Sequence, residues 1–294
     1  MRKFQSVILA LLLLIWGGGA SAQNLMDLLV EEEEVKAEFT TNTFFTTRVI
    51  NGQSVENPYP NELIFVISHH FGQINQGAYQ FWGLDQATIR LGFDYGVNDR
   101  LALSIGRSSY EKTYDGFLKY KLLRQQTGLK EVPLTVSWFS GIYIKGLKSA
   151  VPENYQFQDR LSFVHQLMIA RKFSRSLSLQ ITPAWVHNNL ASSASDPNDF
   201  FVLGLGGRLR LTNWVSASME YFYRFNEPVS FQSYNALSLG FDFDTGGHVF
   251  QLHFTNSQPM FEKAFLTETR GNWLDGGIYF GFHISRVFSF KKGN

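Results

Sequence analysis

Residues 85–108 read DQATIRLGFDYGVNDRLALSIGRS, and this stretch decides the fold class. Over residues 87–97 every second residue is apolar or aromatic, and small, polar or charged residues stand between them. After the turn residues at 98–99, the same alternation resumes over 101–106. Successive side chains of a strand point to opposite faces, so a period of two indicates strands and not helices. The stretch therefore predicts a β-hairpin with one apolar and one polar face.

The alternation recurs along the chain, and other clear examples lie at 177–185, 201–211, 237–243 and 278–284. In each of them the face opposite the apolar one is rich in Gly, Ser, Thr or charged residues. A soluble all-β protein would have to pack every apolar face against something. A membrane β-barrel turns these faces toward lipid and keeps the polar faces around a wet lumen. The pattern favours the membrane barrel.

Composition supports this interpretation. Charged residues make up 17% of the chain and aromatic residues 16%, which is much aromatic surface to bury in a soluble core with so little charge. Membrane barrels place aromatic side chains in interfacial girdles. The mean hydropathy is −0.12, whereas a helical membrane protein needs roughly 20 apolar residues in a row for each span. The net charge of +1 argues against a nucleic-acid partner.

The connections alternate in length. Short turns are predicted at Asn98-Asp99, Thr127-Gly128, Ser174-Arg175, Thr212-Asn213 and Thr245-Gly246, and longer loops at about 72–84, 108–112, 146–158, 189–197, 226–232 and 256–275. Outer-membrane barrels have this asymmetry, with short periplasmic turns and long extracellular loops. If a strand at about 62–71 runs outward, the count from there is about twelve strands, an even number. We predict an all-β fold, an antiparallel transmembrane β-barrel of about twelve strands.

The N-terminus predicts export. Arg2 and Lys3 precede the apolar stretch 7–16, and Ala20-Ser21-Ala22 has the small-x-small form of a cleavage site. Residues 1–22 are therefore expected to be a cleaved signal peptide, which takes the protein to the outer membrane of a Gram-negative bacterium. The chain has no cysteine, which excludes disulfides, thiolate metal sites and the acylation site of a lipoprotein.

Residues 23–61 are predicted to be a periplasmic N-terminal segment, followed by the barrel over 62–294. The acidic run Glu31–Glu34 is typical of a solvated segment, although binding to a partner or to the barrel stays open. Residues 38–50 also resemble a strand. Counting them in the wall would spoil the even number, so they are expected in the periplasm or tucked into the barrel.

Several short motifs occur in a fixed order, namely His70-Phe71-Gly72, Gly83-Leu84-Asp85-Gln86-Ala87, Asp99-Arg100-Leu101, Gly106-Arg107-Ser108-Ser109, Tyr114-Asp115-Gly116 and Lys119-Tyr120-Lys121. On these residues the chain resembles a family of Bacteroidota outer-membrane β-barrels of unknown function, over about residues 38–290. The resemblance implies an outer-membrane barrel and implies no reaction.

Alternation assigns a set of charged and histidine side chains to the lumen: Arg90, Asp94, Asp115, Lys119, Lys121, Arg208, Arg210, Glu220, Arg224, Asp242, His253 and His283. Lining a pore, they would select small polar or anionic solutes. Paired with one another, they would fill the barrel instead. The leading hypothesis is a pore in outer-membrane lipid, and the alternative is a plugged structural or assembly barrel with a protein partner from the envelope.

Two histidine positions raise further alternatives. His69 and His70 suggest a metal site, but no spacing in the sequence supplies the remaining ligands, so no metal or other cofactor is predicted. His165 and Ser140 share the lipid-facing parity, and such a pair would suit acyl-ester hydrolysis of outer-membrane lipid. A strand bulge, or a histidine near the membrane interface, explains this position more simply, so an enzyme is the least favoured of the three hypotheses.

Overall fold

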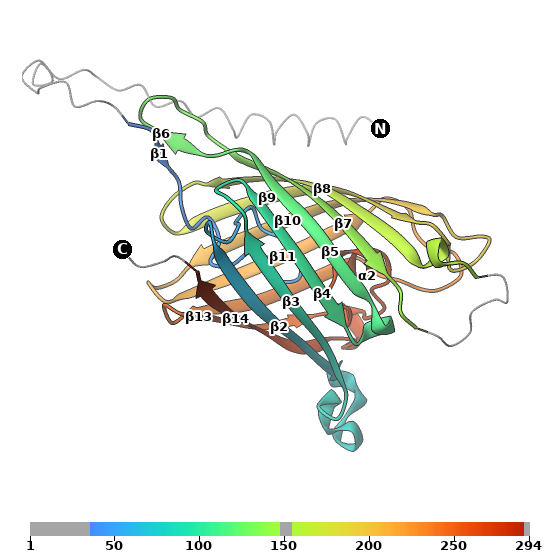
Figure 1. Cartoon of the computed structure of the whole chain (residues 1–294). Helices are drawn as coiled ribbons and strands as arrows, with labels where there is room; N and C mark the ends of the chain where they lie inside the picture. The colour runs from blue at the N-terminus through green and yellow to red at the C-terminus, as the bar shows by residue number, and fades with distance from the viewer. Residues whose placement is uncertain (1–35, 148–154, 291–294) are drawn as a thin grey trace, which may run out of the picture. The chain divides into compact units, whose positions relative to one another are not determined.

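The computed structural model describes residues 36–147 and 155–290. In these ranges, consecutive antiparallel strands close into a single barrel (Figure 1). The wall strands are β2 (Glu62–Gln73), β3 (Ala87–Gly96), β4 (Leu101–Ser108), β5 (Tyr114–Leu123), β7 (Thr135–Ile144), β8 (Leu161–Lys172), β9 (Leu177–Asn188), β10 (Asp199–Arg210), β11 (Val215–Arg224), β12 (Ala236–Asp244), β13 (His248–Thr255) and β14 (Tyr279–Ser289). Strand β14 pairs with β2 and closes the ring, which confirms the predicted fold class and an even count of 12 strands in this part of the chain.

The faces of the wall strands are those that the alternation predicts. Leu91 of β3 is 44% exposed, whereas its neighbour Arg90 is 1% exposed. The other wall strands also expose large apolar side chains on the outside. Their inner faces are mostly polar or small, but β5 and β7 to β11 add buried apolar side chains such as Phe139, Met168 and Phe222. An exposed apolar surface that surrounds a polar interior suits a barrel embedded in lipid.

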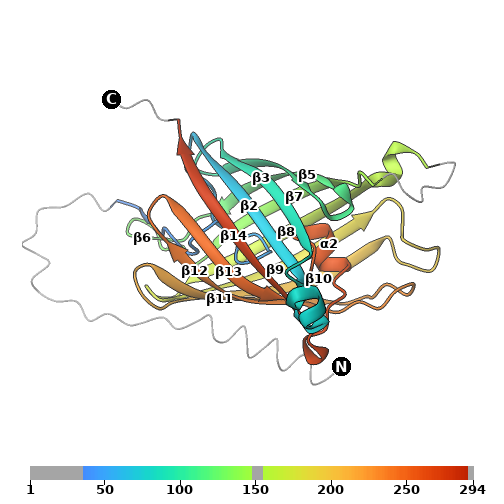
Figure 2. The same cartoon turned by 90° about the horizontal axis from the view of Figure 1, so that it is seen from below.

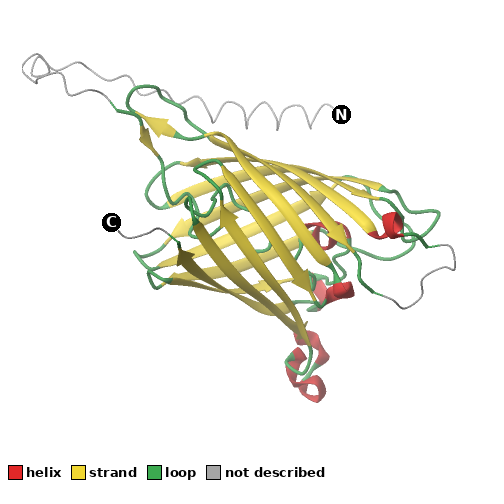
Figure 3. Cartoon of the chain, in the orientation of Figure 1, coloured by secondary structure: helices red, strands yellow, loops and turns green. Residues whose placement is uncertain are grey.

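The two ends of the barrel differ. Short turns follow β3, β8, β10 and β12, and both Glu62 at the start of β2 and Ser289 at the end of β14 lie at this short-turn end. The described helices are short and belong to the opposite, long-loop end (Figure 3). No helix in the described residues is long and apolar enough to cross a membrane.

One predicted turn is wrong in length. Thr127 and Gly128 belong to a longer connection over residues 124–134, between β5 and β7. It is longer because Gln126 and Thr127 form the short strand β6 (Gln126–Thr127), which pairs with β1 (Glu38–Phe39) in a ladder separate from the barrel wall.

The N-terminal segment enters the barrel. Residues 43–55, here called the plug segment, contain mostly buried side chains and lie within the ring of strands (Figure 2, blue). These residues belong to the predicted periplasmic segment 23–61. They lie inside the barrel, which is the second of the two positions, periplasm or barrel interior, that the sequence left open. The predicted signal peptide and the acidic run Glu31–Glu34 lie outside the described residues.

A second segment fills the barrel from the long-loop end. Residues 256–269, here called the inner loop, follow β13 and contain helix α2 (Glu262–Thr267). Helix α2 packs against β8, β9 and β11, and Phe265 lies 5.1 Å from Phe222 of β11, measured between ring centroids. The plug segment and the inner loop together occupy the middle of the barrel.

Candidate functional site

The barrel interior is the candidate site, and the predicted lining residues lie on its side of the wall. Buried side chains among them are Arg90, Asp94, Asp115, Lys119, Arg208, Glu220, Arg224, Asp242, His253 and His283. Lys121 and Arg210 are partly exposed at the short-turn end. Most of these side chains contact the plug segment, the inner loop or one another, so their role in lining a pore stays a prediction.

Glu220 of β11 holds the tip of the plug segment. Its carboxylate accepts hydrogen bonds from the backbone amides of Ile50 (3.1 Å), Asn51 (2.8 Å) and Gly52 (3.0 Å). The tip is a tight hairpin in which the Val49 amide donates to the Gly52 carbonyl at 2.8 Å. A side chain at Gly52 would meet the Phe222 ring at 2.6 Å, so the tip fits against β11 only with glycine at this position.

Lys119 of β5 holds the same hairpin from the other side. Its ammonium donates to the carbonyls of Thr47 (3.3 Å) and Ser54 (3.1 Å), to the Gln53 side chain (3.3 Å) and to the Glu56 carbonyl. Strands β5 and β11 are nearly opposite each other in the closed strand order. The wall thus places an anion against backbone amides and a cation against backbone carbonyls. The carboxylate accepts from the amides, the ammonium donates to the carbonyls, and neither group could take the other's place.

Neutral side chains of the wall complete the attachment. Gln180 accepts from the Val55 amide at 3.1 Å and donates to the Gln53 carbonyl at 2.8 Å. Gln251 donates to the Val49 carbonyl at 2.8 Å. Apolar contacts add to these bonds, because Phe44, Val49 and Val55 belong to the buried core of the interior.

Glu262 joins the two interior segments. Its carboxylate accepts from Arg48 (3.2 Å) and Gln53 (2.8 Å) of the plug segment and from the Tyr143 hydroxyl of β7 (2.6 Å). Sequence reasoning missed Arg48 and Glu262, because alternation assigns no side to a loop residue. It could have found Tyr143, whose neighbours Ile142 and Ile144 have the lipid-facing parity.

Arg90 of β3 and Asp115 of β5 form a buried ion pair within the wall. The Arg90 Nε donates to Asp115 at 3.0 Å, and a second guanidinium nitrogen donates to the other carboxylate oxygen. The guanidinium lies over two glycines, since a Cβ at Gly92 or Gly106 would come within 2.6 Å or 2.5 Å of it. Small residues on two neighbouring strands thus make room for this arginine.

A cavity of about 470 Å³ opens at the long-loop end, and among its lining residues are Glu111, Lys145, Asp159, Arg160, Lys263, Glu268 and Arg270. Tyr110 also lines it, and burial, followed by the nearby carboxylates of Glu268 and Glu111, raises the pKa of its hydroxyl. A smaller cavity of about 180 Å³ lies at the short-turn end beside Lys121 and Arg124. The plug segment and the inner loop lie between the two cavities.

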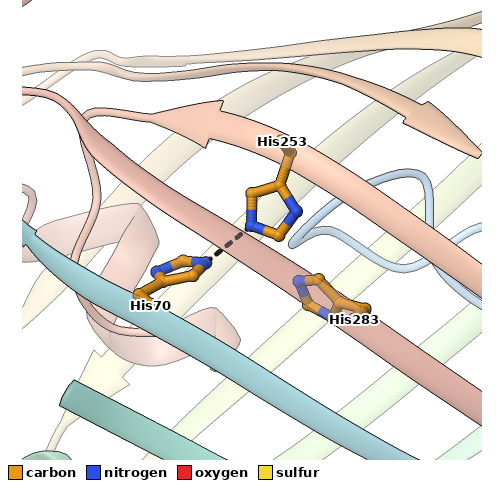
Figure 4. Close-up of side chains that lie close together, drawn as sticks. All are labelled: His70, His253 and His283. Carbon is orange, nitrogen blue, oxygen red and sulfur yellow. Dashed lines mark hydrogen bonds between the residues drawn. The ribbon is translucent and has the colours of Figure 1, made fainter. Parts of the chain in front are cut away.

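His253 of β13 and His283 of β14 lie together with His70 of β2 (Figure 4). The Nε2 atoms of His70 and His253 are 2.8 Å apart. The sequence placed His253 and His283 in the lumen and considered His70 separately. Only the register of three neighbouring strands brings the three rings together.

Ser140 of β7 and His165 of β8 are directly opposite each other in the strand register, both on the outward parity. The His165 ring stacks between Trp138 and Trp185, at centroid distances of 6.2 Å and 5.4 Å. The described residues include no hydrogen bond that joins the serine to the histidine. The arrangement is an aromatic stack on the outer wall.

The comparisons with known proteins agree with this fold. The family described as "Membrane bound beta barrel domain (DUF5777)" matches residues 44–288. The chain is similar to the NanC porin, with a TM-score of 0.50 and 9% identity over 78% of this chain and 100% of that one. It is also similar to an outer membrane channel from Pseudomonas putida F1, with a TM-score of 0.44 and 14% identity over 79% of this chain and 97% of that one. A third similar structure is outer membrane phospholipase A from Escherichia coli, with a TM-score of 0.44 and 12% identity over 82% of this chain and 97% of that one. No curated protein matches the chain. The similarity to the porin is one of fold, and with the family it supports the predicted localisation in the outer membrane.

Proposed function

This chain belongs to the family of membrane-bound β-barrel domains, and from that premise we propose that it is a gated pore for small polar or anionic solutes in the outer membrane of a Gram-negative bacterium of the Bacteroidota. One observation carries the proposal. The barrel is hollow and charged at both ends, and the plug segment and the inner loop lie between its two cavities, together with inward-facing wall side chains such as Phe139 and Phe222. The short-turn end is periplasmic and the long-loop end extracellular in this account.

The attachment of the plug segment suits a gate. The segment precedes β2, the first wall strand, so it can leave the barrel without breaking a wall ladder. Many of its attachments are hydrogen bonds to polar or charged side chains, such as Glu220, Lys119 and Gln180. A typical hydrogen bond has a net value of about 0.5–1.5 kcal/mol, because water can replace either partner. The lumen would thus become solvated, and stay charged, once the plug segment leaves.

The charges support the class of solute. Basic side chains outnumber acidic ones among the predicted lining residues. Arg208 and Arg210 lie at the short-turn end, where both guanidinium groups are within 6 Å of the Phe45 ring, at 4.8 Å and 5.6 Å from its centroid. A positive excess at a pore mouth raises the local concentration of anions.

Replacing both arginines should therefore change ion selectivity. In planar bilayers under a salt gradient, we expect the wild-type barrel to show steps with an anion preference. Arg208→Ala with Arg210→Ala should shift the reversal potential toward that of an unselective pore. Arg286→Ala is the matched control, because Arg286 lies near the same end of β14 and is exposed on the outside. An unchanged reversal potential in the double variant would count against a pore lined by these residues.

A second candidate is a permanently closed barrel that acts as a structural or assembly partner in the envelope. The filled interior favours it. The same recordings separate the two candidates, since a permanently closed barrel stays silent although it is folded and inserted. The lipid-hydrolase hypothesis has less support, because His165 is engaged by two tryptophans and not by Ser140. Outer-membrane lipid around the exposed apolar face is the partner common to every candidate.

A further inference from the structure

Three histidines of neighbouring strands meet inside the barrel wall. Gly281 of β14 pairs with His253 of β13 on one side and with His70 of β2 on the other. His283 is the next residue of β14 with the same parity, and all three imidazoles are buried. Figure 4 shows the rings gathered around one small space, each from a different strand. One ring nitrogen from each residue lies within 4.8 Å of those from the other two.

The glycine between them makes this space. A Cβ at Gly281 would lie 2.4 Å from Cδ2 of His70 and 2.7 Å from Nε2 of His253. Any larger residue would push the two rings apart. The backbone therefore brings the imidazoles close to each other only because position 281 has no side chain.

The outer nitrogens of two rings are held by oxygen atoms. Nδ1 of His70 is 2.9 Å from the Gln258 carbonyl, which can only accept, so this nitrogen carries the proton and Nε2 turns its lone pair toward the other rings. Nδ1 of His283 is 2.9 Å from the Ser68 hydroxyl. Metal-binding histidines typically have their second nitrogen fixed in this way by an oxygen of the protein.

Two ring nitrogens of the cluster are under-satisfied. Nε2 of His283 and Nδ1 of His253 are buried and have no hydrogen-bond partner within the described residues. Buried polar atoms in proteins nearly always have a partner. Within this cluster, the hydrogen bond between Nε2 of His70 and Nε2 of His253 satisfies only one pair. Three buried imidazoles that share only one hydrogen bond leave ring nitrogens without a partner. A bound metal ion would supply that partner.

We propose that His70, His253 and His283 bind a divalent transition-metal ion, with Zn²⁺ as the best fit. Imidazole suits Zn²⁺, Cu²⁺ and Ni²⁺, and a set without carboxylates does not suit Ca²⁺ or Mg²⁺. Zinc–nitrogen bonds are about 2.0–2.1 Å long, and in a tetrahedron this places the nitrogens roughly 3.4 Å apart. The ring nitrogens approach that geometry with small rotations of the side chains. A water molecule or a small anion takes the fourth position.

An access path exists. His283 lines a cavity of about 60 Å³ that also contacts Thr47 and Arg48 of the plug segment and reaches Val287 near the short-turn end. The site therefore takes its ion from the short-turn side of the plug segment, and its occupancy does not require the barrel to conduct.

The test is metal binding to the untagged, full-length barrel in detergent. Titration calorimetry with Zn²⁺ should give one site per barrel, and Co²⁺ should give the visible absorption of a tetrahedral site. His253→Ala and His283→Ala should weaken Zn²⁺ binding at least about 100-fold, because loss of a group that merely orients a ligand already costs about 10–100-fold. His69→Ala is the matched control, because His69 is the neighbour of His70 on β2 and stacks outside on Phe282. It should bind Zn²⁺ as the wild type does.

Variants are compared only after a heat-modifiability gel shows that they are folded. If the alanine variants do not fold, His253→Gln replaces them, and the rise in Tm of the wild-type barrel on adding Zn²⁺ gives a second readout. Wild-type protein that binds neither Zn²⁺ nor Co²⁺ would overturn the proposal. Equal loss of binding in His69→Ala and His253→Ala would also overturn it, as would Ca²⁺ or Mg²⁺ binding as tightly as Zn²⁺.

Discussion

Replacing Glu220 with Gln is expected to raise the open-to-closed ratio of the pore about 100-fold. Glu220 accepts three backbone amides of the plug segment with its two carboxylate oxygens. The Gln side chain has only one accepting oxygen. Its NH₂ group would face a backbone N–H group of the plug segment, and two donors cannot form a hydrogen bond with each other. Hydrogen bonds to a charged group are worth about 1.5–3 kcal/mol each, so the closed state loses on the order of 3 kcal/mol. Each 1.4 kcal/mol is about tenfold, which gives the expected ratio.

Single-channel recording of open probability measures this effect. Asp242→Asn is the matched control, because Asp242 is also a buried carboxylate, on the neighbouring strand β12, and its hydrogen bonds come from the wall side chains Ser216, Ser218 and Gln251 and not from the plug segment itself. Its amide variant should leave the open probability within a few-fold of wild type. An equal rise in both variants would mean that lumen charge in general, and not the grip on the plug segment, sets the closed state.

Removing one partner of the Arg90–Asp115 pair should destabilise the barrel strongly. Asp115→Ala leaves a buried guanidinium without its carboxylate, which costs about 3–5 kcal/mol. Replacing both, as Arg90→Met with Asp115→Leu, should restore most of this loss, because apolar residues of similar volume tolerate such a site. Urea unfolding of the refolded protein measures the free energy of unfolding for each variant.

The pair Glu111–Lys145 provides the contrast. It lies in the loops at the long-loop end and is partly exposed, so Glu111→Ala should change the free energy of unfolding by less than about 1 kcal/mol. A loss as large for Glu111→Ala as for Asp115→Ala would show that burial is not what makes the wall pair important.

The wall of the barrel could be predicted because one rule governs it. Lipid outside and polar groups inside force a period of two, so Leu91 and Arg90 reveal their sides from the sequence alone. The predicted turn at Thr127-Gly128 was too short, because pairing of β6 with β1 adds residues that the wall does not need. It also has nothing to say about residues 43–55, whose environment is the inside of the barrel and not the lipid.

The open or closed state of the lumen could not be read from the sequence for a specific reason. Glu220 and Lys119 bind mainly to backbone amides and carbonyls of the plug segment, and these groups are present at nearly every residue. Contacts to the backbone therefore leave no recognisable pattern in the side chains of the plug segment. The histidine cluster is hidden in another way, since His70 and His253 meet only through the closure of β14 onto β2.

The most direct test of the gated pore is a tether between the plug segment and the wall. The chain has no cysteine, so a disulfide can be introduced cleanly. A Cβ at Gly206 of β10 would lie 3.3 Å from a Cγ atom of Val49 in the plug segment, close to the spacing that a disulfide needs, so Val49→Cys with Gly206→Cys in the Glu220→Gln barrel would link the segment to the wall. Either single cysteine in the same background is the control.

Conductance is then recorded before and after reduction in the same bilayer. For a pore gated by the plug segment, we expect the oxidised barrel to be silent and a reductant to restore the frequent openings of the Glu220→Gln barrel. The single-cysteine controls should not respond to the reductant. Identical conductance in the oxidised and reduced states would contradict it, because solutes would then pass while the plug segment stays fixed to the wall.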